Sequence, residues 1–278
     1  MDAEILRLVE DTYYLGGPGV RDELVWRSIG GVNTLVAKAE EAEAKKEAAP
    51  LTFVALVSEP ESNGKFRLNP DASWTGPMKF TKNFADVRLY GRAIKPSNIP
   101  CFADDFSTIL QNVEWFMKET ETPGYSKQGI FTENENPRAS VNMRHVLFER
   151  TDPKEVEAME KWPVYSDQAR ADLAKIKDTH RVLPLWAYGK DTKLIPPEEY
   201  REALSDAVVC ATVFLKHWAY PPKGDEGGRD VYTADIQHLR VLSKLPITPK
   251  NRTPPPIDPG TPTRASKKAR ITPKKEST

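Results

Sequence analysis

The sequence predicts an α+β fold with a mostly antiparallel sheet, and three observations support this. Residues 207–220, AVVCATVFLKHWAY, contain no Gly or Pro and are rich in β-branched and aromatic side chains, which is typical of a long strand. Further strand-like segments are separated by turns rich in Gly, Pro and Asn. Helical patterns lie between or beside these strands, without the regular strand and helix alternation of a parallel α/β sheet.

The N-terminal part predicts a helix over residues 33–48, NTLVAKAEEAEAKKEA. Asn33 is a suitable N-cap, the residues that follow are mainly Ala, Glu and Lys, and Pro50 ends the pattern. We therefore expect an N-terminal helical segment over residues 1–50.

A hairpin and a further strand follow. Residues 51–58, LTFVALVS, predict a buried strand, and the Asn63-Gly64 turn within residues 61–68 predicts a return strand. Residues 86–94, DVRLYGRAI, predict the next strand.

The middle of the chain combines helices with one strand. Residues 103–119 predict an amphipathic helix, residues 140–149 a strand, and residues 153–178 helical pieces around Pro163. The apolar face of the first helix consists of Phe106, Ile109, Leu110, Val113 and Phe116.

The last strands are expected at residues 181–189, 207–220 and 230–242, with a mobile Gly-rich turn before the final one. Strand alternation divides residues 207–220 into two faces. The core face carries Ala207, Val209, Ala211, Val213 and Leu215, and the other face carries Val208, Cys210, Thr212, Phe214, Lys216, Trp218 and Tyr220.

Residues 51–243 are thus expected to form an α+β domain that resembles a barrel. Long strands with aromatic interiors can curl into a small barrel, and a helix inserted before the last strand pair is compatible with an OB-type barrel. An open sheet with helices on one face is the alternative.

Residues 244–278 predict a disordered, Pro- and Lys-rich tail. They hold eight prolines, and nine basic residues against two acidic ones give a net charge of +7. Because the whole chain is neutral, the remaining residues carry −7. So few apolar residues cannot offset the entropy of ordering the chain.

Catalytic chemistry leaves no pattern in the sequence. Phosphate-loop, dinucleotide-binding, zinc-protease and nucleophile-elbow motifs are all missing from it. Of the four histidines, His217 and His238 would approach each other if the last two strands pair, but a third metal ligand is lacking. We expect a protein without enzymatic activity, cofactor or metal.

Basic and aromatic side chains alternate on the predicted strands, which is the pattern used to bind single-stranded nucleic acid: cations track phosphates and rings stack on bases. The candidate binding residues are Arg88, Tyr90, Arg92, Trp186, Tyr188, Lys216, Trp218 and Tyr220. The acidic charge of residues 1–243 speaks against a large phosphate-binding surface. The alternative is a protein-protein interaction or scaffold module that uses the same sheet for a partner chain.

The segments LPLWAYG, LIPPEEYREALSDAVVCATVFLKHWAY and YTADIQHLRVL add a resemblance. Their order resembles a class of uncharacterised fungal proteins, especially of mushroom-forming fungi. It is also distantly similar to OB-type single-strand DNA-binding proteins, over residues 87–243 at most. This resemblance implies a barrel-like fold and single-stranded DNA binding.

The tail carries targeting and modification patterns. The sequence KKAR at residues 267–270 fits a nuclear import signal formed by Lys267, Lys268 and Arg270, with Lys274 and Lys275 close behind. Thr261 and Thr272 each precede a proline and a basic residue, as proline-directed kinases prefer. The N-terminus lacks the basic start of a signal peptide. We therefore expect a soluble nuclear protein that binds an import receptor through its tail.

Overall fold

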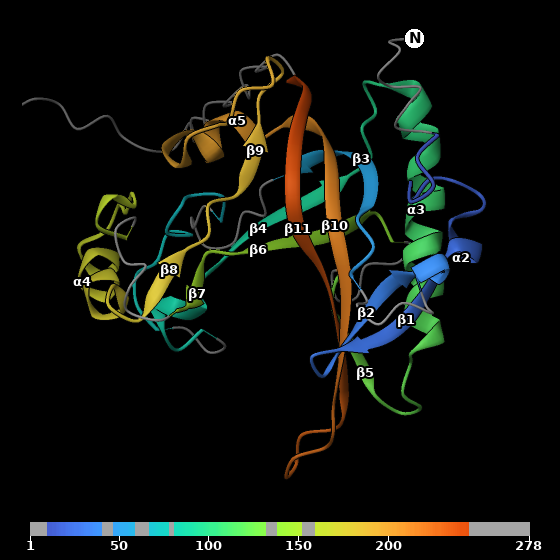
Figure 1. Cartoon of the computed structure of the whole chain (residues 1–278), viewed down its shortest axis with the longest axis horizontal. Coiled ribbons are helices and arrows are strands. Elements are labelled where there is room, and N and C mark those ends of the chain that lie inside the picture. Colours follow the sequence, from blue (N-terminus) through green and yellow to red (C-terminus); the bar gives the residue numbers. More distant parts are fainter. Residues whose placement is uncertain are drawn as a thin grey trace, which may run out of the picture. The chain divides into compact units, whose positions relative to one another are not determined.

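The computed structural model describes residues 10–40, 47–58, 67–77, 81–131, 138–151 and 159–244 (Figure 1). The strands are β1 (Leu24–Ile29), β2 (Val32–Ala37), β3 (Leu51–Ser58), β4 (Arg88–Ile94), β5 (Ser126–Gly129), β6 (Ser140–Val146), β7 (Phe148–Arg150), β8 (His180–Val182), β9 (Trp186–Tyr188), β10 (Ala207–Tyr220) and β11 (Arg229–Lys244). The α-helices are α2 (Val20–Glu23), α3 (Pro100–Glu119), α4 (Asp167–Ile176) and α5 (Tyr200–Leu204), and 3-10 turns are η1 (Lys38–Glu40), η2 (Phe84–Asp86) and η4 (Pro197–Glu199). The predicted α+β class is confirmed.

Five strands close into a barrel. β3 pairs with β4, β4 with β6, β6 with β11, β11 with β10, and β10 with β3. Every pair is antiparallel except β6 with β11, which is parallel. Numbered along the chain, the order around the ring is first, second, third, fifth, fourth, which is the strand order of the OB-fold, a Greek-key barrel. The open sheet considered as the alternative is therefore wrong.

β10 and β11 extend beyond the barrel and recruit further strands. Lys216 and His217, in the C-terminal half of β10, pair with β2, which adds the β1–β2 hairpin to the sheet. One edge of β11 is shared in succession by β5, β6 and β9. Two register shifts between β10 and β11, at Val208/Val209 and Thr212/Val213, are of the kind that bends strands. The long pair can therefore serve both the barrel and its extensions (Figure 1).

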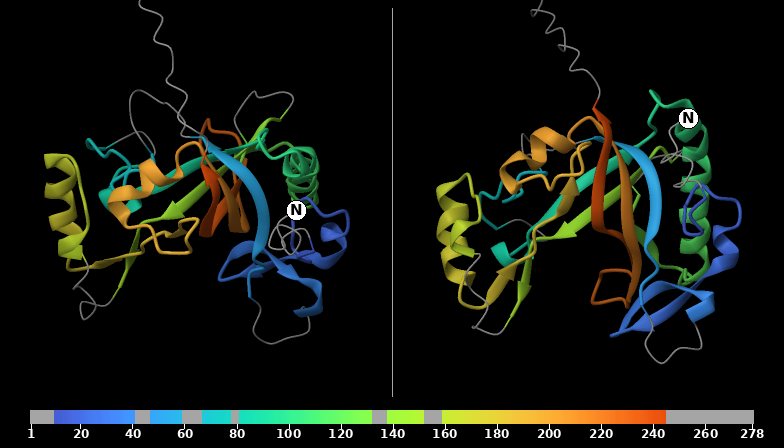
Figure 2. Two further views of the ribbon diagram at one scale, coloured as in Figure 1. Left: turned by 90° about the horizontal axis from the view of Figure 1, so that it is seen from above. Right: turned by 45° about the horizontal axis from the view of Figure 1, so that its top comes forward.

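Helix α3 packs beside the barrel strands, while α4 lies on the other side of them (Figure 2). Helix α3 covers the predicted residues and begins three residues earlier, at Pro100. A proline fits the first turn of a helix, because the N–H that it lacks would have no partner within the helix there. Near its end, the carbonyl of Phe116 accepts from Trp26 Nε1 at 2.9 Å and that of Met117 from the Tyr232 hydroxyl at 2.8 Å. These bonds add partners to carbonyls of the last helical turn, which has few partners within the helix itself.

The alternation predicted for β10 is confirmed in its second half. Leu215 and His217 are buried, whereas Lys216 and Trp218 are half-buried. In the first half of β10, from Ala207 to Val213, the residues on both faces of the strand are buried.

The helix predicted over residues 33–48 is wrong where the structure describes it as a strand. Val32–Ala37 form β2, because Leu35 and Val36 are completely buried and the segment pairs with both β1 and β10. Tertiary pairing here outweighs the helix propensity of Ala, Glu and Lys, as it often does. Residues 41–46 of the predicted helix lie outside the described residues. Leu24 of β1 and Leu35 of β2 lie in the same buried cluster as the barrel residues, so the N-terminal strands share the barrel's core.

The hairpin predicted after β3 lies mostly outside the described residues. Residues 59–66, which include its expected turn, lie outside the described residues, and Arg67 and Leu68 lie in a turn instead of a return strand. The neighbours of β3 are β4 and β10, which bury it on both edges. The predicted tail also lies outside the described residues, except that β11 runs to Lys244. Among the described helices, none is long and apolar enough to span a membrane.

Candidate nucleic-acid interface

Alternating side chains of β4, β6, β11 and β10 project from the barrel on one side. Their neighbours in sequence, among them Leu89, Met143 and Ala234, are buried in the core. Strand register aligns the projecting residues, because Tyr90 lies opposite Arg144, Arg144 opposite Asp235, and Lys216 opposite Thr233. The barrel face, as we call this surface, consists of Arg88, Tyr90, Arg92, Asn142, Arg144, Lys216, Trp218, Val231, Thr233 and Asp235.

A charged network lies at the centre of the barrel face. Arg144 Nε donates to Asp235 Oδ1 at 2.7 Å, and Lys216 Nζ lies 3.0 Å from Asp235 Oδ2. Burial raises the pKa of this carboxyl, but the two cations outweigh burial and hold the pKa below its usual value. One carboxylate thus orients two cations, and the network keeps a net positive charge.

The Arg144 guanidinium also lies 5.4 Å from the centre of the Trp218 ring. Trp218 is half-buried, so its ring supports Arg144 and is not fully enclosed by the core. Stacking of a guanidinium on an aromatic ring leaves the opposite face of the guanidinium plane available for another flat group.

Strand β4 contributes one exposed ring between two anchored cations. The Tyr90 side chain is 37% exposed, and the Arg67 guanidinium lies 5.8 Å from its ring centre. Arg88 Nη1 donates to the carbonyls of Ala85 and Val87, and Arg92 Nε donates to Ser140 Oγ. Burial, followed by the nearby charge of Arg144, lowers the pKa of Arg88. Tyr90 is therefore the most accessible aromatic side chain of the barrel face.

Five of the eight predicted binding residues come together on the barrel face: Arg88, Tyr90, Arg92, Lys216 and Trp218. Tyr220 continues the same face of β10 towards the turn, is 44% exposed, and has the Arg229 guanidinium 5.3 Å from its ring centre. Trp186 and Tyr188 lie apart, because β9 pairs with β11 at His238–Arg240, beyond the segment that carries Thr233 and Asp235.

The sequence prediction missed Asn142, Arg144, Thr233 and Asp235. The sequence did contain a signal for Asn142 and Arg144. Side chains alternate along the predicted strand, so these two lie on the face away from the core residues Val141 and Met143. Their position beside Tyr90 and Asp235 depends on strand pairing, which the segment itself does not encode.

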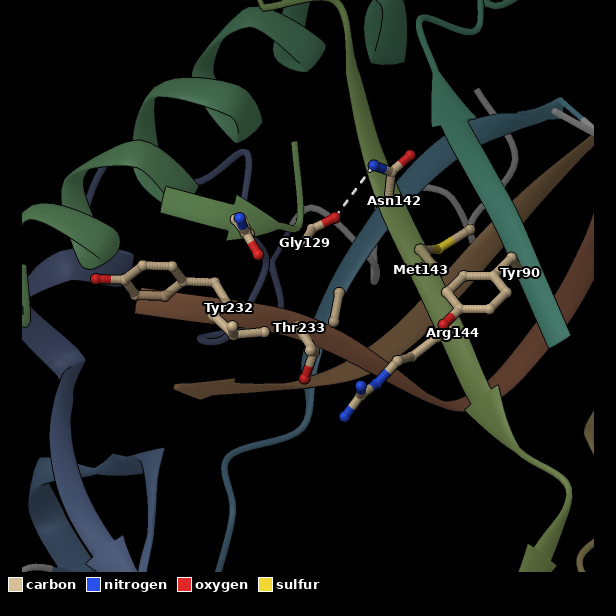
Figure 3. Close-up of a pocket in the computed structure, with 10 residues that line it drawn as sticks. Tyr90, Gly129, Asn142, Met143, Arg144, Tyr232 and Thr233 are labelled. Carbon is tan, nitrogen blue, oxygen red and sulfur yellow. Dashed lines mark hydrogen bonds between the residues drawn. The ribbon is translucent and has the colours of Figure 1, made fainter. Parts of the chain in front are cut away.

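A pocket of about 340 Å³ opens at the edge of the barrel face, between β5, β6 and β11 (Figure 3). Tyr90, Gln128, Asn142, Arg144 and Thr233 are among the residues that line it. Asn142 Nδ2 donates to the Gly129 carbonyl at 3.1 Å and so links β6 to β5. The pocket is continuous with the barrel face because both share Tyr90, Asn142, Arg144 and Thr233.

The predicted approach of His217 to His238 is wrong. His217 lies opposite Tyr232, whereas His238 lies opposite Thr212, farther from the turn. His217 instead contacts Asp230 at 3.0 Å and stacks on Tyr232 with ring centres 4.5 Å apart. Because the His217 and Asp230 side chains are 2% and 0% exposed, this pair is a structural link without access for a substrate.

No group of three or more His, Cys, Asp or Glu side chains suited to a metal ion occurs within the described residues.

Comparisons with known proteins yield distant structural likenesses. No protein-family model matches the chain, and no curated protein matches its sequence. The single-stranded DNA-binding protein from bacteriophage Enc34 is similar with a TM-score of 0.37 and 9% identity, over 82% of this chain and 94% of that chain. The structure of the same phage protein in complex with single-stranded DNA is similar with a TM-score of 0.36 and 9% identity, over 81% of this chain and 98% of that chain.

A single-stranded DNA-binding protein encoded by bacteriophage T7 gives a TM-score of 0.31 and 10% identity, over 71% of this chain and 89% of that chain. The resemblance to fungal proteins stays a prediction.

Proposed function

We propose that this protein binds single-stranded nucleic acid through the barrel face. The observation that carries the proposal is the exposed Tyr90 ring beside Arg144, on the second and third strands of a closed OB-type barrel, with Trp218 of the fourth strand supporting Arg144. In OB-folds, the face of these two strands and the loop between the last two strands form the surface on which oligonucleotides bind.

Each part of the barrel face has a role in this proposal. The Tyr90 ring and the outer face of the Arg144 guanidinium stack on successive bases. Lys216, Arg88 and Arg92 supply positive charge for the phosphates, and Asp235 orients the heads of Arg144 and Lys216. Tyr220 and Arg229 extend this surface along the β10–β11 hairpin.

The local charge differs from that of residues 1–243 as a whole. Although these residues carry −7, the barrel face brings Arg88, Arg92, Arg144 and Lys216 around a single carboxylate, that of Asp235. A local excess of cations attracts phosphates even on a protein that is acidic overall, and the attraction weakens as salt screens it.

The alternative function, a protein-interaction module, has one observation in its favour. Trp186 and Leu194 are 61% and 56% exposed, and both belong to the segment around β9, away from the barrel face. Exposed apolar side chains of this size are typical of surfaces that bind partners. Trp186→Ala would impair such an interaction and leave single-strand binding unchanged.

Tyr90→Ala is expected to weaken binding to single-stranded DNA by roughly 1 to 3 kcal/mol, because it removes one stacking ring. The measurement is fluorescence polarisation of a labelled oligonucleotide over a salt series, with single-stranded RNA and duplex DNA as comparisons. Because Tyr90 is 37% exposed, the thermal midpoint should stay close to that of the wild type.

The matched control is Tyr165→Ala, which removes a tyrosine that is 56% exposed and does not belong to the barrel face. It should bind like the wild type. Wild-type affinity in the Tyr90 variant, or equal losses in both variants, would contradict the proposed interface.

We also propose that the protein acts in the nucleus without enzymatic activity, and that Lys267, Lys268, Arg270, Lys274 and Lys275 engage an import receptor. Clustered Lys and Arg in a Pro-rich segment support this proposal. Replacing the first three with Ala should move a fluorescent fusion, too large for passive entry, from the nucleus to the cytoplasm in microscopy. Thr261→Ala with Thr272→Ala, which removes the proposed phosphorylation sites, is the control. Unchanged nuclear accumulation of the basic-residue variant would disprove the import signal.

A further inference from the structure

The pocket beside the barrel face forms where β11 changes partners. Residues Arg229–Tyr232 of β11 pair with β5, and Ala234 and Asp235 pair with β6, so Thr233 lies at the step between the two neighbours. β5 ends at Gly129, whose φ is +103°. A Cβ at this position would lie 2.3 Å from the Tyr232 carbonyl oxygen, so only glycine allows this approach.

Thr233 lines the pocket, and its buried hydroxyl has no hydrogen-bond partner among the residues that the structure describes. Its side chain is 5% exposed. Buried polar atoms are nearly always satisfied, because leaving one unpaired is costly. A hydroxyl can both donate and accept a hydrogen bond. Either a donor or an acceptor atom of a ligand would therefore satisfy it.

Other groups of the pocket suit a flat, polar ligand. Gln128 and Asn142 carry amides, which pair with the donor and acceptor edges of bases. Tyr90 and Arg144 also line the pocket, so a base inside it would lie next to the groups on which the neighbouring bases stack. The volume of about 340 Å³ lies near the lower end of the range for small-ligand pockets, which is enough for one heterocycle.

We infer that this pocket receives one nucleobase of the bound strand and makes binding depend on base identity. The inference rests on the proposed function and adds selectivity to it. The bases on either side stack on the barrel face, which tolerates any base, while the inserted base forms hydrogen bonds with Thr233 and the neighbouring amides. A stacking surface alone would not distinguish bases by hydrogen bonding.

Thr233→Val tests this inference, because valine keeps the shape of threonine and removes the hydroxyl. We expect wild-type affinities for the four DNA homopolymers of equal length to differ, and the variant to bind the preferred one about three- to tenfold more weakly. Its salt dependence should not change, since no cation is removed. Thr233→Ser, which keeps the hydroxyl, should restore the preference.

Ser243→Ala is the matched control: Ser243 lies on the same strand, its hydroxyl is also buried without a partner among the described residues, and it does not line the pocket. It should bind like the wild type. Thermal melting should show that Thr233→Val is at least as stable as the wild type, because it removes an unsatisfied group.

The possible results separate the inference from the proposed function. If the wild type binds neither the DNA homopolymers nor single-stranded RNA even at low salt, the proposed function fails, and the inference fails with it. If the wild type binds all four equally and Thr233→Val matches it, the pocket inference alone is overturned. A loss that is equal for all four homopolymers also overturns it, because the hydroxyl would then not read the base.

Discussion

Val213→Asp is expected to abolish the folded state. Val213 is completely buried and lies opposite both Ile236 of β11 and Leu51 of β3. An aspartate here would place a charge between two strands of the barrel, with the apolar residues Ile236 and Leu51 as its register partners. The cost is comparable to the whole stability of a typical domain, about 5 to 15 kcal/mol. Circular dichroism and urea denaturation would detect the loss.

Lys216→Ala is the control on the other face of the same strand. Lys216 is half-buried and contacts Asp235, which keeps its bond to Arg144 in the variant. We expect a change in stability of at most about 1 kcal/mol. Similar melting of Val213→Asp and Lys216→Ala would show that the two faces of β10 are wrongly assigned, and with them the barrel face.

Asp230→Ala is expected to destabilise the protein by about 3 to 5 kcal/mol. Asp230 is completely buried and accepts from Thr122 N at 2.7 Å and Thr122 Oγ1 at 3.0 Å. His217 Nε2 lies 3.0 Å away and donates, because a carboxylate can only accept. The variant leaves the buried His217 N–H and the partly buried donors of Thr122 without this acceptor, which costs far more than the loss of a surface contact.

Loss of the Asp230 carboxylate should also loosen the secondary-structure elements that it holds together. Thr122 follows the end of α3, and Asn33 of β2 lies 3.2 Å from His217 Nδ1, so one cluster joins α3, β2, β10 and β11. Urea denaturation measures the loss of stability. Asp225→Ala, which removes an exposed aspartate in the β10–β11 turn, is the control and should be neutral. A midpoint for Asp230→Ala equal to that of the control would show that the cluster is not structural.

The strands of the barrel could largely be predicted from local patterns. β3, β4, β6, β10 and β11 all lie where runs of β-branched and aromatic residues indicate them. Such patterns work because half-buried strands repeat every two residues. The prediction failed for β2. The run of Ala, Glu and Lys after Asn33–Ala37 favoured a helix, whereas the strand is stabilised by its pairing with β1 and β10.

The candidate site was predicted in part. Tyr90, Lys216 and Trp218 were found because each alternates with core residues along its own strand. Arg144 and Asp235 were missed because their importance comes from each other and from Trp218, across three strands. The Thr233 pocket could not be predicted, since it exists only where β11 passes from β5 to β6.

The sequence by itself determined the fold class, the positions of the barrel strands, and which face of β10 carries Lys216 and Trp218. These properties depend on local periodicity, and a strand keeps the alternation of its side chains whatever its neighbours are. The tertiary structure alone decided that the sheet closes, that Tyr90 lies beside Arg144, and that His217 meets Asp230 and not His238. Neighbours and register are set by contacts between residues far apart in the chain, and a shift of one residue would turn every side chain to the opposite face.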